Sequence, residues 1–477
     1  MPDPAPASPS PLTASADVVV VGAGISGLAT AYFLRRSLGP DAVIQVVEAG
    51  PEAGGKVRTR SLVGLPVDTG PDAFLSRAPE LGRLVEALGL ADEVIDPLAG
   101  SASIWSRGRL RPLPPGMAFG LPDRLVALLR SGLLSPLETV RAGLDLVLPR
   151  TPLPADPTVA DLVRPRFGDG VYQRLAAPLL GGVHAGDPAQ LSARSTVPEI
   201  AAMAGSGRSL YLTMRSRRRR APAPAPGAPR PRAPLVSIRG GLSRLVDRLV
   251  EDIGHDAVHL DTPVLGLEPA DGGWVVVTDH GRVSTRRVVL ATPAPAAAAL
   301  LEDHSADAAD RLREIPYVDV ANVTLALPAD EVGPLPAGTG FLVPPVEGEL
   351  TVGCTWLSQK WPHLAQPDHV VVKTMVGRAG DRRWVAMDDD ELVGRVRDDL
   401  RRLLGITAAP DDLLVQRWPR AMPQYVVGHA ARLDALDAAV ATLPGIALTG
   451  AAYRGIGLAG CVAQASSTAD RIAAGTS

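Results

Sequence analysis

The sequence predicts an α/β fold, and glycine-rich turns near the two ends of the chain are the main reason. Near the N-terminus, a run of β-branched residues at 17–21 leads into the turn at 22–27 and then into a helix pattern. Near the C-terminus, an apolar strand at 445–450 precedes a glycine-rich turn at 453–460 and a helix pattern over 461–474. A strand, a glycine turn and a helix in this order are typical of a doubly wound sheet that binds a nucleotide.

The N-terminal turn has the G-x-G-x-x-G spacing of a Rossmann-type dinucleotide-binding domain. Gly22 permits the tight turn, Gly24 lets the backbone approach a pyrophosphate, and Gly27 allows the helix to pack closely on the sheet. A second apolar strand at 43–47 ends at Glu48, which is placed to accept hydrogen bonds from a ribose. The whole context favours dinucleotide binding over a structural glycine turn without a ligand.

The bulk composition limits the class of protein. A chain of 477 residues has room for two or three domains, and a net charge of −3 argues against a nucleic-acid partner. Cys354 and Cys461 are the only cysteines, so we expect neither a disulfide framework nor a metal site. Residues 1–15 are rich in Pro, Ala and Ser and are expected to form a disordered tail, not a signal peptide. A cytoplasmic location is expected, with at most peripheral contact with a membrane.

The residues that follow Glu48 favour FAD over NAD. Residues 53–59 contain a glycine doublet and Lys56, and residues 67–74 form a strand that turns sharply. This pair of loops resembles the large FAD family of amine oxidases, phytoene desaturases and porphyrinogen oxidases, whose second motif is a glycine doublet followed by a basic residue. The C-terminal strand, turn and helix resemble the flavin element of that family, although alone they could be a structural corner.

The resemblance implies a set of FAD contacts. Val264 matches a position that contacts adenine in the family, but it could equally be an ordinary strand residue. The implied set is Gly22, Ala23, Gly24, Ile25, Ser26, Gly27, Glu48, Ala49, Gly55, Lys56, Gly70, Pro71, Asp72, Ala73, Val264, Trp418, Gly450, Ile456, Gly457 and Leu458.

The resemblance also implies a domain organisation. We expect a discontinuous FAD-binding domain of residues 16–75, 235–300 and 415–477, together with a discontinuous α+β substrate domain. In the second domain, residues 76–214 are expected to form a mainly helical subdomain and residues 301–414 to contain a sheet. Residues 215–234 are rich in Arg and Pro and are expected to form a solvated loop insertion.

Three segments narrow the resemblance to the porphyrinogen oxidases: residues 178–188, 416–425 and 453–458. The implied activity is oxidation of coproporphyrinogen III to coproporphyrin III in heme biosynthesis, with O₂ as acceptor and H₂O₂ as product. Three lysines stand against 45 arginines, a composition that resembles high-GC Gram-positive bacteria, in which the family generally acts on coproporphyrinogen. Protoporphyrinogen oxidase, amine oxidase and carotenoid desaturase remain alternatives, as does a non-catalytic flavin carrier or chaperone.

The site of catalysis is less well defined by the sequence. His184 is a candidate base because its unperturbed pKa lies near neutrality, although a histidine buried for structural reasons is the simpler interpretation. Arginines could hold the propionates of a porphyrinogen, and the candidates are Arg58, Arg107, Arg109 and Arg111. An apolar helical stretch at 121–134 is expected to pack inside the substrate domain or to contact a membrane. Transient contact with a downstream heme-pathway enzyme is a further expectation.

Overall fold

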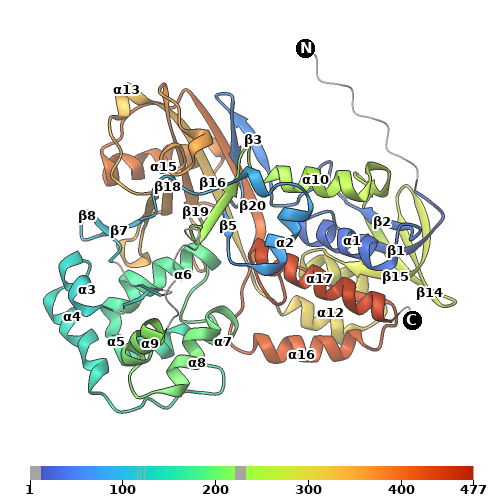
Figure 1. Cartoon of the computed structure of the whole chain (residues 1–477), viewed down its shortest axis with the longest axis horizontal. Coiled ribbons are helices and arrows are strands. Elements are labelled where there is room, and N and C mark those ends of the chain that lie inside the picture. The colour runs from blue at the N-terminus through green and yellow to red at the C-terminus, as the bar shows by residue number, and fades with distance from the viewer. Residues whose placement is uncertain (1–11, 115–116, 119, 123, 221–231, 476–477) are drawn as a thin grey trace.

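The computed structural model describes residues 12–114, 117–118, 120–122, 124–220 and 232–475. Two seven-stranded sheets and a group of helices make up the described chain. In the view of Figure 1, the first sheet and its helices lie on the right, the second sheet at the upper left and the helical group at the lower left. The predicted tail falls largely on residues 1–11, which lie outside the described residues.

The first sheet has the parallel centre that the N-terminal pattern predicts. Four parallel neighbours form its centre, with β1 between β2 and β15 and with β12 beyond β2. The fifth parallel strand, β21, pairs with the end of β15, and β14 and β13 continue the sheet as an antiparallel meander. The strands are β1 (Ser15–Val21), β2 (Ile44–Val47), β12 (Val258–His259), β13 (Val264–Ala270), β14 (Gly273–Thr278), β15 (Gly281–Leu290) and β21 (Ile446–Leu448).

Helices cover both faces of this sheet, as the continuous apolar pattern of its central strands requires. One face packs against α1 (Ile25–Leu38), α2 (Pro79–Ala87), α10 (Ser243–Ile253) and α17 (Leu458–Ala474). The other face packs against α11 (Ala294–Leu301), α12 (Ala306–Arg313) and α16 (His429–Val440). Although α2 falls in the range predicted for the helical subdomain, its residues Leu81, Leu84 and Val85 are buried in the core that α1 and α17 share.

The second sheet has the strand order β20-β16-β19-β18-β17-β7-β8. Its strands are β7 (Ser103–Ser106), β8 (Arg109–Pro112), β16 (Tyr317–Pro328), β17 (Gly340–Leu342), β18 (Thr351–Trp356), β19 (His369–Val376) and β20 (Asp412–Pro423). Its outer face packs against α15 (Asp389–Leu404) through Leu392, Val396 and Leu400. Three of these strands differ from the prediction, because β20 pairs with β16 instead of joining the FAD domain, and β7 and β8 extend the sheet from within the predicted helical range.

The group of helices that shares one core begins at Leu125, because β7 and β8 occupy part of the range predicted to be helical. It comprises α3 (Leu125–Ser131), α4 (Pro136–Gly143), α5 (Val159–Val171), α6 (Ala177–His184), α7 (Ala193–Thr196), α8 (Pro198–Ser206) and α9 (Leu210–Arg220). Helix α9 continues through the arginines at 217–220, where the sequence suggested a loop, while residues 221–231 lie outside the described part of the chain. The helices share one core with Phe167, Leu175 and Leu180 at its centre.

The remaining short elements connect these three parts. They are β3 (Thr59–Leu62), β4 (Leu65–Asp68), β5 (Phe74–Leu75), β6 (Val94–Ile95), β9 (Met117–Ala118), β10 (Leu121–Pro122), β11 (Leu235–Ile238), α13 (Ala329–Val332) and α14 (Leu357–Lys360). Strand β11 pairs with β5 and β6 and leads into α10, so the chain returns from the helical subdomain to the first sheet at this point.

Candidate active site

The first glycine turn has the geometry that its sequence predicts. Gly22 has a φ of +103°, which a side chain would strain, and its amide donates to the carbonyl of Val47 at 2.7 Å. A Cβ atom on Gly27 would lie 1.8 Å from the carbonyl oxygen of Gly22, so only glycine fits there. Gly24 is the N-cap of α1, and Ile25 and Ser26 open its first turn. The N-terminus of α1 is therefore presented at the carboxyl edge of the sheet, where a pyrophosphate binds in this fold.

Glu48 is fixed beside this turn. Its Oε2 accepts a hydrogen bond of 2.8 Å from the amide of Ala23, and its Oε1 accepts one of 2.9 Å from the amide of Gly50. The carbonyl of Glu48 accepts a hydrogen bond from Thr262, and Val264 begins β13 two residues later. Glu48, Ala49 and Val264 are thus brought to the same end of the sheet, as expected for one cofactor.

The glycine doublet folds back onto the first turn. The amide of Gly54 donates to the carbonyl of Ala23 at 2.7 Å, and a Cβ atom on Gly55 would lie 3.2 Å from the Cα of Gly24. Lys56 follows directly. Burial lowers the pKa of its ammonium group, and Cys461 raises it to a smaller extent. No carboxylate among the described residues pairs with Lys56, so its charge is available to an anionic ligand.

The second sheet donates hydrogen bonds to the backbone of the loop at 68–73. Lys373 on β19 donates to the carbonyl oxygens of Asp68 at 3.2 Å and Gly70 at 3.0 Å. Asn322 on β16 donates to the carbonyl of Thr69 at 2.7 Å, and the indole of Trp418 on β20 donates to the same oxygen at 3.4 Å. Trp418 is therefore adjacent to the loop that contains Gly70, as the resemblance implies.

Asp72 has a role that the sequence does not reveal. Its carboxylate accepts hydrogen bonds from Lys360 at 2.8 Å and from the indole of Trp361 at 3.0 Å, and it lies 3.8 Å from the ammonium of Lys373. Burial alone would raise the pKa of Asp72. The charges of Lys360 and Lys373 lower the pKa by more than burial raises it, so the pKa of Asp72 lies below its ordinary range. The carboxylate is thus an internal counter-ion. The predicted cofactor contact of this loop is therefore left to residues other than the Asp72 carboxylate.

The C-terminal element completes the same site. Gly450 has a φ of +136°, and a Cβ atom on it would lie 3.9 Å from the hydroxyl of Ser26. Ile456 precedes Gly457, which is the N-cap of α17, and Leu458 is the first residue of that helix. Burial raises the pKa of Cys461, and the Ser26 side chain beside it lowers it. The N-termini of α1 and α17 therefore lie next to each other, and the positive ends of two helix dipoles converge.

The residues present fit FAD. The turns at Gly24 and Gly55 leave backbone uncovered where a pyrophosphate must approach closely. The buried hydroxyls of Thr292 and Thr449, which follow β15 and β21, have no hydrogen-bond partner among the described residues. Unsatisfied buried hydroxyls at the carboxyl edge of a parallel sheet are what a polar ligand would satisfy.

The second sheet presents a row of half-buried side chains on the face opposite to α15. Strand pairing aligns Leu342 with Gly353, Gly353 with Met375, Met375 with Asn322, and Asn322 with Gln416. Leu342, Met375, Asn322 and Gln416 are only partly buried, while their neighbours Ala321 and Val323 are completely buried against α15. This row therefore forms a mainly apolar floor. One end is Asn322, which contacts the loop at 68–73, called the flavin loop below. The other end is Leu342, which lies against Gly182 of α6.

His184 lies at the end of α6 and is 7% exposed. Burial lowers its pKa to about 4, so the imidazole is neutral at physiological pH. Gln424, which follows β20, donates to the carbonyl of His184 at 2.9 Å and ties α6 to the second sheet. The location of His184 supports a packing role more than a role as base.

The four arginines suggested by the sequence do not come together. Arg107, Arg109 and Arg111 lie in or between β7 and β8 at the far edge of the second sheet, and Arg107 forms an ion pair with Glu138 at 2.5 Å. Arg58 lies 5.6 Å from the ring of Trp418 and 3.6 Å from Glu52. Of the four, only Arg58 is next to the predicted cofactor residues.

Sequence reasoning missed Lys373, Asn322 and Lys360. Each lies on β16, β19 or the adjacent α14, far along the chain from the loop that it supports. The rarity of lysine was the available signal, since two of the three lysines hold the flavin loop.

Comparison with known proteins agrees with this site. The profile of the family described as flavin-containing amine oxidoreductase matches residues 25–473. A coproporphyrinogen III oxidase from Propionibacterium freudenreichii is 36% identical over 98% of this chain and 92% of its own, and one from Bacillus subtilis is 31% identical over 94% and 96%. A solved structure from Exiguobacterium sp. 255-15, provisionally named a protoporphyrinogen oxidase, superposes with a TM-score of 0.86 at 34% identity, covering 96% of this chain and 98% of that one.

The family match includes the second sheet and the C-terminal element, the relatives cover 94–98% of the chain, and together they confirm the predicted fold class and cofactor. The chain therefore belongs to the flavin-containing amine oxidoreductase family, in its porphyrinogen oxidase branch, and is an oxidoreductase whose cofactor is FAD.

Proposed function

We propose that this protein oxidises coproporphyrinogen III to coproporphyrin III in heme biosynthesis, with O₂ as electron acceptor and H₂O₂ as product. The observation that carries the proposal is the apolar floor of the second sheet, which begins at the loop that Asn322 holds beside the FAD-binding motifs. The near full-length similarity to coproporphyrinogen III oxidases from two bacteria supports this substrate. The overall reaction removes six hydrogens from the macrocycle and transfers them to three molecules of O₂.

FAD supplies the two-electron chemistry when it is bound. The residues of this chain bind and orient it: Gly24 and Gly55 admit the pyrophosphate, and Glu48 is aligned for the ribose. The adjacent N-termini of α1 and α17 stabilise negative charge near them. Leu342, Met375 and Asn322 do not titrate near neutrality, so these three floor residues supply no acid–base group.

The floor suits a flat apolar macrocycle. Gly353 lies between Leu342 and Met375, and the side chains of these two neighbours lie over it, so the centre of the row is apolar. Arg58 stands beside Trp418 at the flavin loop and is the arginine of the predicted four that could bind a propionate there. Protoporphyrinogen IX has the same macrocycle with fewer carboxylates, so it is the second candidate substrate. An amine substrate is less well served, because aromatic residues make up only 4% of the chain.

We also propose peripheral contact with a membrane through the helical subdomain. Six large apolar side chains are exposed on α3, α4 and the turn that follows them: Val126, Leu129, Leu137, Val140, Leu144 and Val147. Leu137 is 83% exposed, which is unusual for leucine on a free surface. Arginines at 124 and 130 lie on the same segment as Val126 and Leu129 and would complement anionic lipids. No helix among the described residues is long and apolar enough to cross a membrane. Contact with a downstream heme-pathway enzyme stays a prediction.

The test is a comparison of substrates. The purified flavoprotein is mixed in air with coproporphyrinogen III or with protoporphyrinogen IX, and porphyrin fluorescence and peroxide are recorded together. Faster turnover of coproporphyrinogen III is expected. Faster turnover of protoporphyrinogen IX would mean that this compound is the substrate, and the proposed porphyrinogen oxidation would still stand. A flavin-loaded protein that is inert to both would contradict the proposal, and amines and carotenoids would then be tested.

A further inference from the structure

The helical subdomain contains a cavity that the proposed reaction does not use. It has a volume of about 1140 Å³ and lies between the end of β8, helix α3 and helix α9. None of its lining residues belongs to the flavin motifs or to the floor of the second sheet. The volume is comparable with the upper range of small-molecule pockets, which is roughly 300–1000 Å³.

The lining combines strong positive charge with an apolar wall. Five arginines line the cavity: Arg124, Arg130, Arg215, Arg218 and Arg219. No aspartate or glutamate is among its described lining residues. The wall between these arginines is largely apolar, with Leu113 from the segment after β8 and Leu125 from α3. The side chain of Arg215 donates to the hydroxyl of Tyr211, which also lines the cavity, at 3.4 Å.

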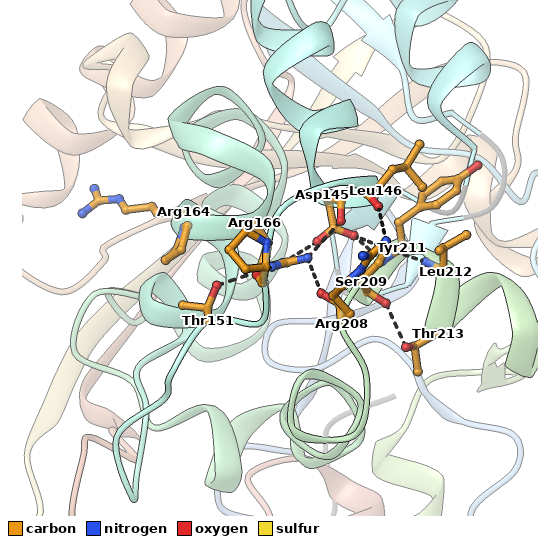
Figure 2. A network of polar contacts seen from close by, with 12 residues as sticks. Asp145, Leu146, Thr151, Arg164, Arg166, Arg208, Ser209, Tyr211, Leu212 and Thr213 are labelled. Carbon is orange, nitrogen blue, oxygen red and sulfur yellow. Dashed lines mark hydrogen bonds and ion pairs between the residues drawn. The ribbon is translucent and has the colours of Figure 1, made fainter.

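A buried polar network fixes the helix that carries three of these arginines. Figure 2 shows Asp145 between Arg166 and the start of α9. The carboxylate of Asp145, which is fully buried, accepts hydrogen bonds from the Ser209 hydroxyl at 2.6 Å and from the Tyr211 amide at 2.8 Å. The guanidinium of Arg166 pairs with the same carboxylate and also donates to the carbonyl of Pro149 at 2.6 Å. The α9 wall of the cavity is therefore positioned by the core of the subdomain.

The chemistry of the lining selects its ligand. A small, multiply charged anion would pair with arginines of the lining but would leave the apolar wall, which includes the exposed Val126, uncovered. A fatty acid would cover the apolar wall but bring only one carboxylate to a lining that includes Arg130, Arg215 and Arg219. An apolar macrocycle with carboxylates on several sides matches both features, because guanidinium groups bind carboxylates in bidentate pairs.

We propose that this cavity is a second tetrapyrrole site, which holds the tetracarboxylate porphyrin product outside the oxidation site. The inference rests on the proposed function for its choice of ligand. A porphyrin held here has one face against the apolar wall after it leaves the flavin, and its carboxylates face the exposed side chains of Arg130, Arg215 and Arg219. The site and the exposed apolar surface of α3 share Val126, so the porphyrin would be held next to that surface.

Coproporphyrin III itself is the probe. The FAD-loaded protein is titrated with coproporphyrin III, and binding is measured by the porphyrin absorbance shift and by calorimetry. The double variant Arg130→Gln/Arg219→Gln removes two cavity arginines. The matched control, Arg217→Gln/Arg220→Gln, removes two exposed arginines of α9 that do not line the cavity and has the same net charge. All four positions are exposed, so the fold is retained, and circular dichroism checks this.

We expect two porphyrins per chain for the wild type and for the control. In the cavity variant, we expect the affinity of one of the two sites to fall by about tenfold or more. One porphyrin per chain in every protein would overturn the inference, as would equal losses in variant and control, which would indicate a general charge effect. The cavity variant could instead lose binding to vesicles of anionic lipid while it still binds porphyrin. This result would overturn the inference and would show that the cavity binds a lipid headgroup. Turnover of coproporphyrinogen III by the wild type is measured separately, so failure of the proposed function is distinguished from failure of the second site.

Discussion

The carboxylate of Asp72 and the ammonium of Lys360 form an ion pair of 2.8 Å that joins the loop at 68–73 to α14, the helix that follows β18 of the second sheet. Lys373 approaches the same carboxylate at 3.8 Å and donates to the backbone of the loop. The two halves of the active site are therefore connected by a buried charge cluster and not only by apolar packing.

Replacement of Asp72 should be costly. Asp72→Ala leaves two lysines without their counter-ion, and Lys373 is only 3% exposed. The expected loss in the free energy of unfolding is about 3–5 kcal/mol, the range for breaking a buried ion pair. Urea denaturation measures it. Asp390→Ala, at an exposed position in the first turn of α15, is the control and should cost much less. A loss below about 1 kcal/mol for Asp72→Ala would mean that the cluster is solvated.

Two glycines of the fingerprint should behave differently when replaced by alanine. A Cβ atom on Gly24 would have the Cα of Gly55, at 4.0 Å, as its nearest neighbour, whereas a Cβ atom on Gly27 would lie 1.8 Å from a carbonyl oxygen. Gly24→Ala should therefore leave the unfolding midpoint of the apoprotein unchanged but lower FAD affinity by about tenfold or more, because the methyl group blocks the pyrophosphate. Gly27→Ala should lower the midpoint itself. Thermal unfolding with and without FAD separates the two effects, and a destabilised Gly24→Ala apoprotein would contradict this assignment.

Asp68 should make stability depend on pH. Burial raises its pKa from 3.8 to about 6, although hydrogen bonds from Thr59 and Leu242 and the charge of Lys373 oppose this shift. The folded state therefore binds the proton more tightly than the unfolded state, so the stabilisation is complete below about pH 4 and is lost as the pH rises through 6. Between these pH values the wild type should lose about 2 kcal/mol relative to Asp68→Asn. Parallel urea titrations measure the difference, and a difference that is flat across this window would refute the raised pKa.

His184 should not control the rate. Its pKa of about 4 keeps the imidazole neutral between about pH 5.5 and pH 8, so it has no ionisation to contribute there. We expect His184→Gln to leave the shape of the pH profile of kcat/KM unchanged, even if packing around α6 reduces its height. The disappearance of an ionisation near pH 6.5 in the variant would instead identify His184 as the base.

The sequence predicts the first sheet better than the second. Gly22, Gly24, Gly27 and Glu48 lie within a short stretch of chain, and the structure places them at one end of the first sheet, while their contact with FAD stays a prediction. The C-terminal element could be placed because Gly450 and Gly457 repeat the same strand–turn–helix logic.

Long-range pairing explains what the sequence did not predict. Strand β20 pairs with β16, and the paired residues are nearly a hundred positions apart in the sequence. Asn322 and Gln416 are one such pair. The strands β7 and β8 join β17 from a segment that otherwise precedes helices, and nothing local distinguishes them from a separate hairpin. Asp72 was expected at the cofactor because its loop matches a motif, but its lysine partners lie on later elements of the chain.

Anaerobic reduction of the bound flavin tests the central claim most directly. The FAD-loaded protein is mixed with coproporphyrinogen III in the absence of O₂, and the flavin absorbance is followed together with porphyrin formation. The account predicts loss of the oxidised flavin band, with one porphyrin formed for every three flavins reduced, and recovery of the band when air is admitted. A flavin spectrum that stays oxidised while the porphyrinogen is present would contradict it.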